Sequence, residues 1–244
     1  MMHLLVTRPE PDAQATAERL AALGIDSTLA PVMSRQTLSP NLPPARGFAG
    51  IAITSTNALR AMEDLGVLEA FRTIPAFAVG DRTAHEARLL GFTSVEAADG
   101  TLASLVTRIA LARLPGPLFY PSGKHLSGDL AQALAPHGLM VVTSPVYEMI
   151  AETSLPKDVL TGLTEDRFGG VLLYSRRSAE IFAELATTRL PEIQKRRLPM
   201  LCLSENVAAA LIENHFSRIL LADHPSEDAM MALALAFARE QTGA

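Results

Sequence analysis

The chain has 244 residues, of which 48% are hydrophobic and 19% are charged, and its formal net charge at pH 7 is −5. The hydrophobic fraction is enough to build a packed core, which excludes a disordered chain. The acidic balance excludes a broad basic surface for nucleic acid. Because aromatic residues make up only 5% and tryptophan is missing, a surface on which bases stack is not expected either. The single cysteine, Cys202, excludes an internal disulfide and a cysteine-built metal site, and its apolar neighbours predict a buried thiol.

Targeting and membrane segments are not visible in the sequence. The N-terminus lacks a basic region before its apolar run, which is unlike a secretory signal. The longest late apolar stretch, residues 229–238, is roughly half of what a bilayer-spanning helix needs. We therefore expect a cytoplasmic protein with no membrane partner.

A repeated pattern predicts the secondary structure along the chain. A short apolar run ends in a small polar cluster, and a helical period follows. In chain order the pattern covers residues 3–24, 50–66, 76–91, 117–138, 170–186, 199–216 and 218–237. Short apolar runs that alternate with helices predict parallel strands buried on both faces. Glycines stand where these helices should end, at Gly24, Gly66, Gly91 and Gly138.

Three further strands complete the prediction. Residues 94–97 form a short strand before a helix at 101–113. Residues 27–32 and 140–147 follow helices without the polar cluster, and each contains a Pro-Val pair. Because proline has no N–H for the strand ladder, we expect these two segments to be edge strands or exits from a sheet.

Counting elements predicts the domain layout. Residues 36–150 contain five strands and four helices, and residues 1–35 plus 151–244 together contain the same number. The sequence therefore predicts an α/β fold of two similar parallel-sheet lobes of flavodoxin or Rossmann type, one of them discontinuous. The two Pro-Val segments would be a two-stranded crossover ladder between the lobes. The alternative is one sheet of nine or ten strands.

Candidate binding residues lie in the turns after the strands, where parallel α/β sheets bind ligands and helix N-termini offer free N–H groups. A single hydroxyl there is also what a helix cap requires, so the repetition across both lobes is what indicates a site for carboxylate or phosphate groups. The candidate substrate-binding residues are Arg8, Ser55, Thr56, Gly80, Arg82, Thr83, Ser122, Lys124, Ser175, Arg176 and Ser204.

Other catalytic and binding motifs are not found. The stretch from Gly116 to Lys124 has the wrong loop length for a P-loop, and neither G-x-G-x-x-G after a strand nor G-x-S-x-G occurs. The six histidines lack metal-ligand spacing, so no metal is expected. Tyr147, just after a Pro-Val pair, is the candidate catalytic residue, because a phenol can donate a proton at neutral pH. The alternative is a hinge residue that only packs.

Six segments together resemble the uroporphyrinogen-III synthase family. They are LLVTRP, ITSTNAL, AVGDRTAHEARLLGF, SPVYEM, YSRRSAEIF and LCLSENVAAAL, and they cover nearly the whole chain. No single segment is diagnostic, and their order and spacing carry the resemblance. It implies two α/β lobes joined by a two-stranded ladder. It also implies a cofactor-independent lyase that cyclises the linear tetrapyrrole hydroxymethylbilane to uroporphyrinogen III, with ring D inverted, in haem, sirohaem and cobalamin synthesis.

The resemblance also implies residue roles. Tyr147 matches the tyrosine that is the family's best candidate acid, and Ser55 and Ser175 match polar turn positions. Gly80 and Thr83 match a G-x-x-T turn. The family's usual threonines in the other lobe's turn and after the tyrosine are replaced here by Val207 and Met149, so no hydroxyl role is expected at those two positions.

The remaining expectations concern partners and the alternative function. We expect a monomer that binds its small-molecule substrate, with transient contact with the preceding pathway enzyme. The alternative function is a non-catalytic two-lobed binding protein for a small polyanionic ligand. A receiver-type regulatory module is disfavoured, because Arg8 and Pro9 follow the first strand in place of an acidic pocket.

Overall fold

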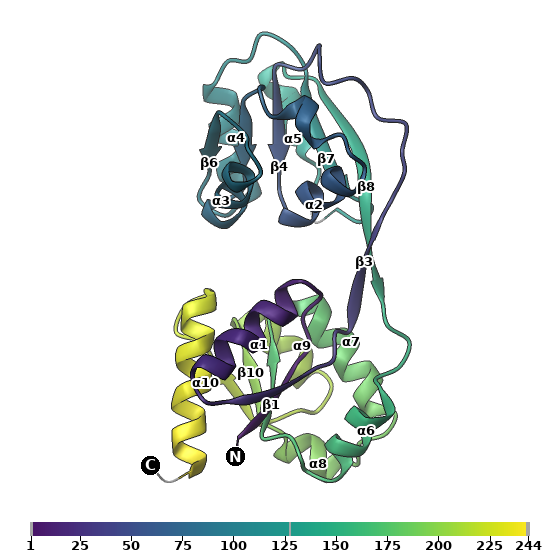
Figure 1. The fold of residues 1–244 in the computed structure, drawn as a ribbon, viewed down its shortest axis with the longest axis vertical. Helices are drawn as coiled ribbons and strands as arrows, with labels where there is room; N and C mark the ends of the chain where they lie inside the picture. The colour runs from purple at the N-terminus through teal and green to yellow at the C-terminus, as the bar shows by residue number, and fades with distance from the viewer. Residues whose placement is uncertain (1, 127, 243–244) are drawn as a thin grey trace. The chain divides into compact units, whose positions relative to one another are not determined.

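The computed structural model describes residues 2–126 and 128–242. Contacts divide the chain into two compact units: unit 1 is Met1–Ser34 with Ile150–Ala244, and unit 2 is Arg35–Met149. Each unit is a sheet covered by helices (Figure 1), and eight strand pairs, four in each unit, are parallel. The predicted α/β class with two parallel sheets is confirmed.

Unit 1 has the strand order β11-β10-β9-β1-β2. Numbered within the unit, this is the 2-1-3-4-5 order of flavodoxin-like sheets. The central strands are short and fully buried, as the apolar runs predict. The strands are β1 (His3–Val6), β2 (Asp26–Leu29), β9 (Gly170–Leu173), β10 (Met200–Cys202) and β11 (Ile219–Leu221).

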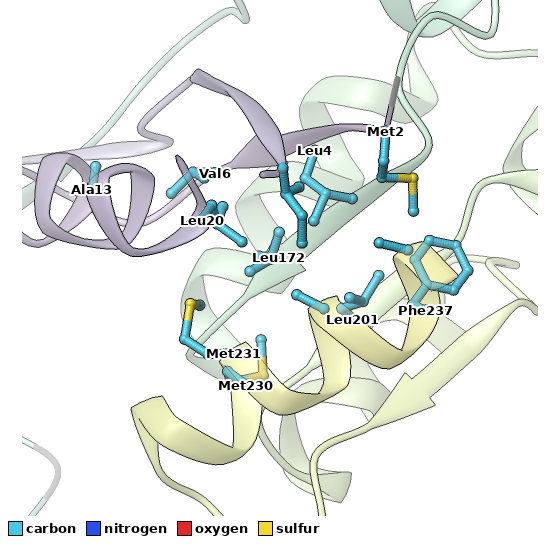
Figure 2. Close-up of a cluster of buried hydrophobic side chains, with 13 residues drawn as sticks. Met2, Leu4, Val6, Ala13, Leu20, Leu172, Leu201, Met230, Met231 and Phe237 are labelled. Carbon is cyan, nitrogen blue, oxygen red and sulfur yellow. The ribbon is translucent and has the colours of Figure 1, made fainter. Parts of the chain in front are cut away.

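Helices α1 and α10 pack on one face of the unit 1 sheet (Figure 2), where Leu20 of α1 and Phe237 of α10 join Leu4, Leu172 and Leu201 in one buried cluster. This packing joins the two ends of the chain in one core. The helices of unit 1 are α1 (Asp12–Ala22), α6 (Lys157–Thr164), α7 (Arg176–Thr187), α8 (Glu192–Arg197), α9 (Glu205–Ile212) and α10 (Glu227–Thr242).

Unit 2 has the strand order β3-β8-β7-β4-β5-β6. Starting from β4, the chain first adds β5 and β6 on one side and then β7 and β8 on the other, which is a Rossmann-type arrangement. The strands are β3 (Met33–Thr37), β4 (Gly50–Ile53), β5 (Ala76–Ala78), β6 (Val95–Ala97), β7 (Leu118–Gly123) and β8 (Val141–Ala151).

Two hydrophobic clusters hold the helices of unit 2 on opposite faces of its sheet. On one face of the sheet, Phe119 of β7 packs in a cluster with residues of α2 and α3 such as Leu59 and Ala87. Its neighbours in the strand, Leu118 and Tyr120, face α4 and α5 residues instead, as expected for side chains that alternate along a strand. The helices are α2 (Thr56–Asp64), η1 (Leu68–Phe71), α3 (Asp81–Leu89), α4 (Leu102–Leu111), α5 (Leu130–Leu134) and η2 (Ala135–His137).

The two Pro-Val segments differ from each other. Residues 27–32 are not one strand, because β2 ends at Leu29 and β3 begins after Val32 as the edge strand of the other sheet. Of residues 140–147, all but Met140 belong to β8, which continues through Pro145 and lies between β3 and β7. The predicted helix-ending glycines have positive φ, from 67° at Gly66 to 91° at Gly91. Within the described residues, no helix is both long and apolar enough to cross a bilayer.

Candidate functional site

A cavity lies in unit 2 where the strand order reverses, at the carboxyl ends of β4 and β7. Adjacent loops diverge at such a point, which is where open α/β sheets bind ligands. The cavity has a volume of about 310 Å³. It is lined by Thr54, Ser55, Val79, Gly100, Leu102, Tyr120, Gly123, His125, Leu126, Gly128 and Tyr147. None of these described lining residues is acidic, so the lining itself carries no negative charge.

Tyr147 enters this cavity from β8. It pairs with Gly123 of β7 after an irregularity in the register at Ser122 and Gly123, and the Lys124 amide donates to the Tyr147 carbonyl at 2.8 Å. A Cβ atom added at Gly123 would lie 3.0 Å from Cζ of the Tyr147 ring and 3.1 Å from its hydroxyl oxygen. The missing side chain of Gly123 is therefore what allows the phenol to lie against β7.

The turn after β4 supplies hydroxyl groups to the cavity. Ser55 caps α2, and its Oγ accepts a hydrogen bond from the Asn57 amide at 3.1 Å. Thr56 is the first residue of α2 and is half-buried, but it is outside the cavity lining. Thr54 Oγ1 lies 3.0 Å from the Tyr120 hydroxyl of β7. Burial raises the pKa of the Tyr120 phenol; the hydrogen bond with Thr54 opposes this rise, and nearby Tyr147 adds to it.

A charged group lies beside the cavity. The Lys124 ammonium donates to Glu148 Oε2 at 2.9 Å, and His125 Nε2 lies 3.3 Å from Glu148 Oε1. The hydrogen bond from Lys124 is the main reason that the pKa of Glu148 is lowered. Lys124 is about half exposed, so a carboxylate of a ligand could reach its ammonium in place of Glu148.

The other predicted residues of unit 2 do not line the cavity. A Cβ atom added at Gly80, which precedes α3, would come within 3.3 Å of the Gly100 backbone. Thr83 is buried in α3, whereas Arg82 is exposed. Ser122 is buried, and its Oγ has no hydrogen-bond partner among the described residues.

Three predicted residues are at helix N-termini of unit 1. Ser175 caps α7 and accepts from the Ser178 amide at 3.1 Å, whereas Ser204 precedes α9 without a side-chain cap. The Arg176 guanidinium is 2.8 Å from Glu180 and 3.1 Å from Glu213. Arg176 is thus already paired with carboxylates of its own unit.

Arg8 is buried in a polar cluster of unit 1. Its guanidinium bonds Glu227, Thr16 at 2.9 Å and Asp12 at 3.2 Å. It also lies 4.1 Å from the centre of the Tyr174 ring, in cation–π contact. Burial first, and then the Glu227 carboxylate, raise the pKa of Tyr174. These contacts indicate that Arg8 holds unit 1 together.

Tyr120 was missed by the sequence analysis, as was its contact with Thr54. The only signal was that Tyr120 is one of three tyrosines and directly precedes Pro121, Ser122 and Gly123, which the structure places at the end of β7. As for metal sites, no group of three histidine, cysteine, aspartate or glutamate side chains in the described residues could hold an ion.

The fold and the cavity define a class: a protein of two parallel-sheet α/β units with a hydroxyl-lined ligand site at strand ends. A family model described as uroporphyrinogen-III synthase HemD matches residues 14–232. The chain therefore belongs to the uroporphyrinogen-III synthase family. This is a lyase family of porphyrin biosynthesis, and its reaction is the cyclisation of hydroxymethylbilane.

Solved structures share the fold. Uroporphyrinogen-III synthetase from Helicobacter pylori has a TM-score of 0.69 and 18% identity, over 97% of this chain and 99% of that chain. A mutant uroporphyrinogen III synthase from Thermus thermophilus has a TM-score of 0.59 and 19% identity, and the match covers 100% of this chain and 100% of that chain. A comparison with curated proteins gave no significant match.

Proposed function

We propose that this chain closes hydroxymethylbilane to uroporphyrinogen III with Tyr147 as the general acid. The observation that carries the proposal is the Tyr147 phenol in the wall of a cavity at the switch point of unit 2. A general acid must reach the group that it protonates. Tyr147 meets this requirement if the ring A hydroxyl of the substrate enters the cavity beside its phenol.

The first step is loss of the terminal hydroxyl of ring A. Tyr147 donates its proton to that oxygen, the C–O bond breaks and water leaves, so that ring A becomes an azafulvenium cation that keeps its N–H proton, and Tyr147 becomes a tyrosinate. The substituted carbon of ring D then attacks this electrophile and forms a spiro intermediate. Fragmentation and reclosure invert ring D. The tyrosinate is reprotonated by the proton that the final pyrrole releases, so the cycle needs neither a cofactor nor a metal.

The competing reaction is direct closure to the type I isomer, which proceeds without an enzyme. The protein must therefore favour one closure over another, which requires contacts that are stronger in one transition state. We assign the substrate carboxylates to Lys124 and to the Ser55–Thr56 turn, whose N–H groups begin α2. Arg8 is assigned no substrate contact, because its guanidinium is engaged within unit 1.

The test is the isomer composition of the product. Purified protein with freshly made hydroxymethylbilane should give mainly the type III isomer, read after oxidation by chromatography. Type I alone, formed at the spontaneous rate, would contradict the proposal. Binding of the bilane without acceleration would instead support the alternative of a non-catalytic binding protein.

The acid role is tested with Tyr147→Phe. Turnover should fall by roughly 100-fold or more, the range for one general acid, while the thermal unfolding temperature stays near that of the wild type. Tyr174→Phe, in the polar cluster of unit 1, is the matched control and should keep its turnover. Unchanged turnover in Tyr147→Phe would remove the acid role.

We further propose a monomeric, cytoplasmic enzyme that contacts the preceding pathway enzyme only transiently. The proposal is supported by the placement of the cavity lining within unit 2, which needs no second copy. Light scattering should give the mass of one 244-residue chain. A concentration-independent dimer would contradict the monomer.

A further inference from the structure

We infer that Tyr120 is a positioning residue, which orients the Thr54 hydroxyl in the cavity and so helps to favour the type III closure. The inference rests on the proposed function. It is carried by the contact between the two hydroxyl groups, 3.0 Å apart, on the wall that also holds Tyr147.

The contact joins the two strands that flank the switch point. Thr54 follows β4 and Tyr120 belongs to β7, which pair in parallel at Gly50 with Leu118 and at Ile51 with Phe119. The two hydroxyls are 66 residues apart in the chain. The pairing of β4 with β7 therefore brings the two residues together, and the contact between their hydroxyl groups then depends on both side chains.

Packing fixes the Tyr120 side chain. Only 4% of the residue is exposed, and its ring belongs to the cluster that contains Leu105, Leu130 and Leu134. Because burial raises its pKa, the phenol keeps its proton at neutral pH. Tyr120 therefore offers a neutral hydroxyl at a fixed position.

The two hydroxyl groups of Thr54 and Tyr120 together keep one proton that they can donate to a ligand. Each hydroxyl carries one proton, and one of the two is used between them. Within the described residues, neither hydroxyl has another hydrogen-bond partner. When Tyr120 donates to Thr54, the remaining Thr54 proton is available to the cavity. A substrate carboxylate can accept it, whereas a pyrrole N–H cannot.

This placement links the pair to isomer choice. A hydrogen bond from Thr54 to an acetate or propionate group would limit how one pyrrole ring can turn while the azafulvenium cation exists. Without Tyr120, the Thr54 hydroxyl rotates freely and the constraint weakens. A larger share of the azafulvenium cation would then close directly to type I.

The test uses Tyr120→Phe, which keeps the ring in the core and removes only the hydroxyl. We expect the type I share of the product to rise at least fivefold and kcat/KM to fall about tenfold, with an unchanged pH profile for turnover. Thr54→Val should do the same, and Thr54→Ser should restore the wild-type isomer ratio. The double variant should be no worse than either single variant, because both remove one contact.

Controls separate this inference from the proposed function and from misfolding. Tyr174→Phe should leave the isomer ratio unchanged, and unfolding temperatures identify variants that fail to fold. If the wild type itself gives only type I, the proposed function fails. If the wild type gives type III and Tyr120→Phe keeps both its isomer ratio and kcat/KM, the positioning role is overturned. Additive effects in the double variant would overturn it as well.

Discussion

The Tyr147 ring packs directly on Gly123, where a Cβ atom would lie 3.0 Å from Cζ and 3.1 Å from the hydroxyl oxygen. These distances are shorter than ordinary carbon contacts, so any side chain at Gly123 must displace the phenol by a few tenths of an ångström. Gly123 and Tyr147 are partners across β7 and β8. The position of the proposed acid therefore depends on a glycine in the neighbouring strand.

Gly123→Ala should lower kcat by roughly tenfold, because small displacements of a catalytic group are costly. KM and the unfolding temperature should change little, since the ring is only half-buried. Gly116→Ala is the matched control, because a Cβ atom there would make an ordinary contact of 3.5 Å with Ala49. Steady-state kinetics of both variants check the prediction. A wild-type kcat in Gly123→Ala would show that the acid tolerates displacement or lies elsewhere.

Glu148→Gln should lower KM for the bilane by about two- to fivefold and leave kcat unchanged. The substitution frees the Lys124 ammonium, now 2.9 Å from Glu148, for a substrate carboxylate. The effect should shrink at high salt, because exposed charges are screened. The pKa of Glu148 is held below 4.5, so the wild-type carboxylate stays charged at assay pH values above that.

Glu96→Gln is the control for a general change in charge. It removes an exposed carboxylate near Arg108 in the same unit and lies outside the cavity lining. Its KM should match that of the wild type. An equal fall in KM for both variants would show that net charge, rather than release of Lys124, decides binding.

Arg8→Ala should destabilise the protein by up to about 3–5 kcal/mol, as expected when one partner of a buried ion pair is removed. The Arg8 side chain is only 8% exposed and links the end of β1 to Asp12 of α1 and Glu227 of α10. Urea unfolding measures the loss. Arg19→Ala, which breaks an exposed pair with Asp228, should cost under about 1 kcal/mol. If Arg8→Ala instead raises KM with little loss of stability, Arg8 contacts the substrate rather than stabilising unit 1.

The fold class could be predicted because parallel strands buried on both faces leave a local signature. Ile51 to Ile53, for example, form a short apolar run that ends at a polar turn, and the structure buries all of it as β4. Strand β3, with the sequence MSRQT, has no such run. It forms because β8, more than a hundred residues away, lies beside it. Local patterns carry no information about that pairing.

Some residues of the candidate site could likewise be predicted from local sequence, whereas others could not. Ser55 and Tyr147 were identified from turns and from the family resemblance, and the structure brings both to one cavity; their roles stay predictions. In the sequence, Tyr120 looks like an ordinary strand residue, and only the pairing of strands in the sheet brings it beside Thr54. Arg8 reads as a turn cation, yet its partner Glu227 is 219 residues away. Both contacts join segments that are distant in the chain, so local sequence patterns could not predict them; a substrate-binding role of Arg8 stays an untested prediction.

Cys202 provides a prediction about unit 1 that is independent of the reaction. Its thiol is fully buried in β10, and burial raises its pKa to about 12. The folded state thus binds the proton more tightly than the unfolded state, whose thiol has an ordinary pKa near 9.0. The resulting stabilisation is fully present below pH 9 and is lost as the pH rises from there toward 12, by up to about 1.4 kcal/mol per pH unit.

Urea unfolding of the wild type and of Cys202→Ala at pH 8 and pH 10 checks this, because all other groups titrate alike in both. The stability advantage of the wild type should be smaller at pH 10 than at pH 8 by about 1.4 kcal/mol. A thiol reagent at pH 8 should label the native protein far more slowly than the urea-unfolded protein, because reaction requires the thiolate and access to it. Equal labelling rates would show that β10 is open to solvent in the native state. An advantage that does not change with pH would show that the thiol ionises alike in both states.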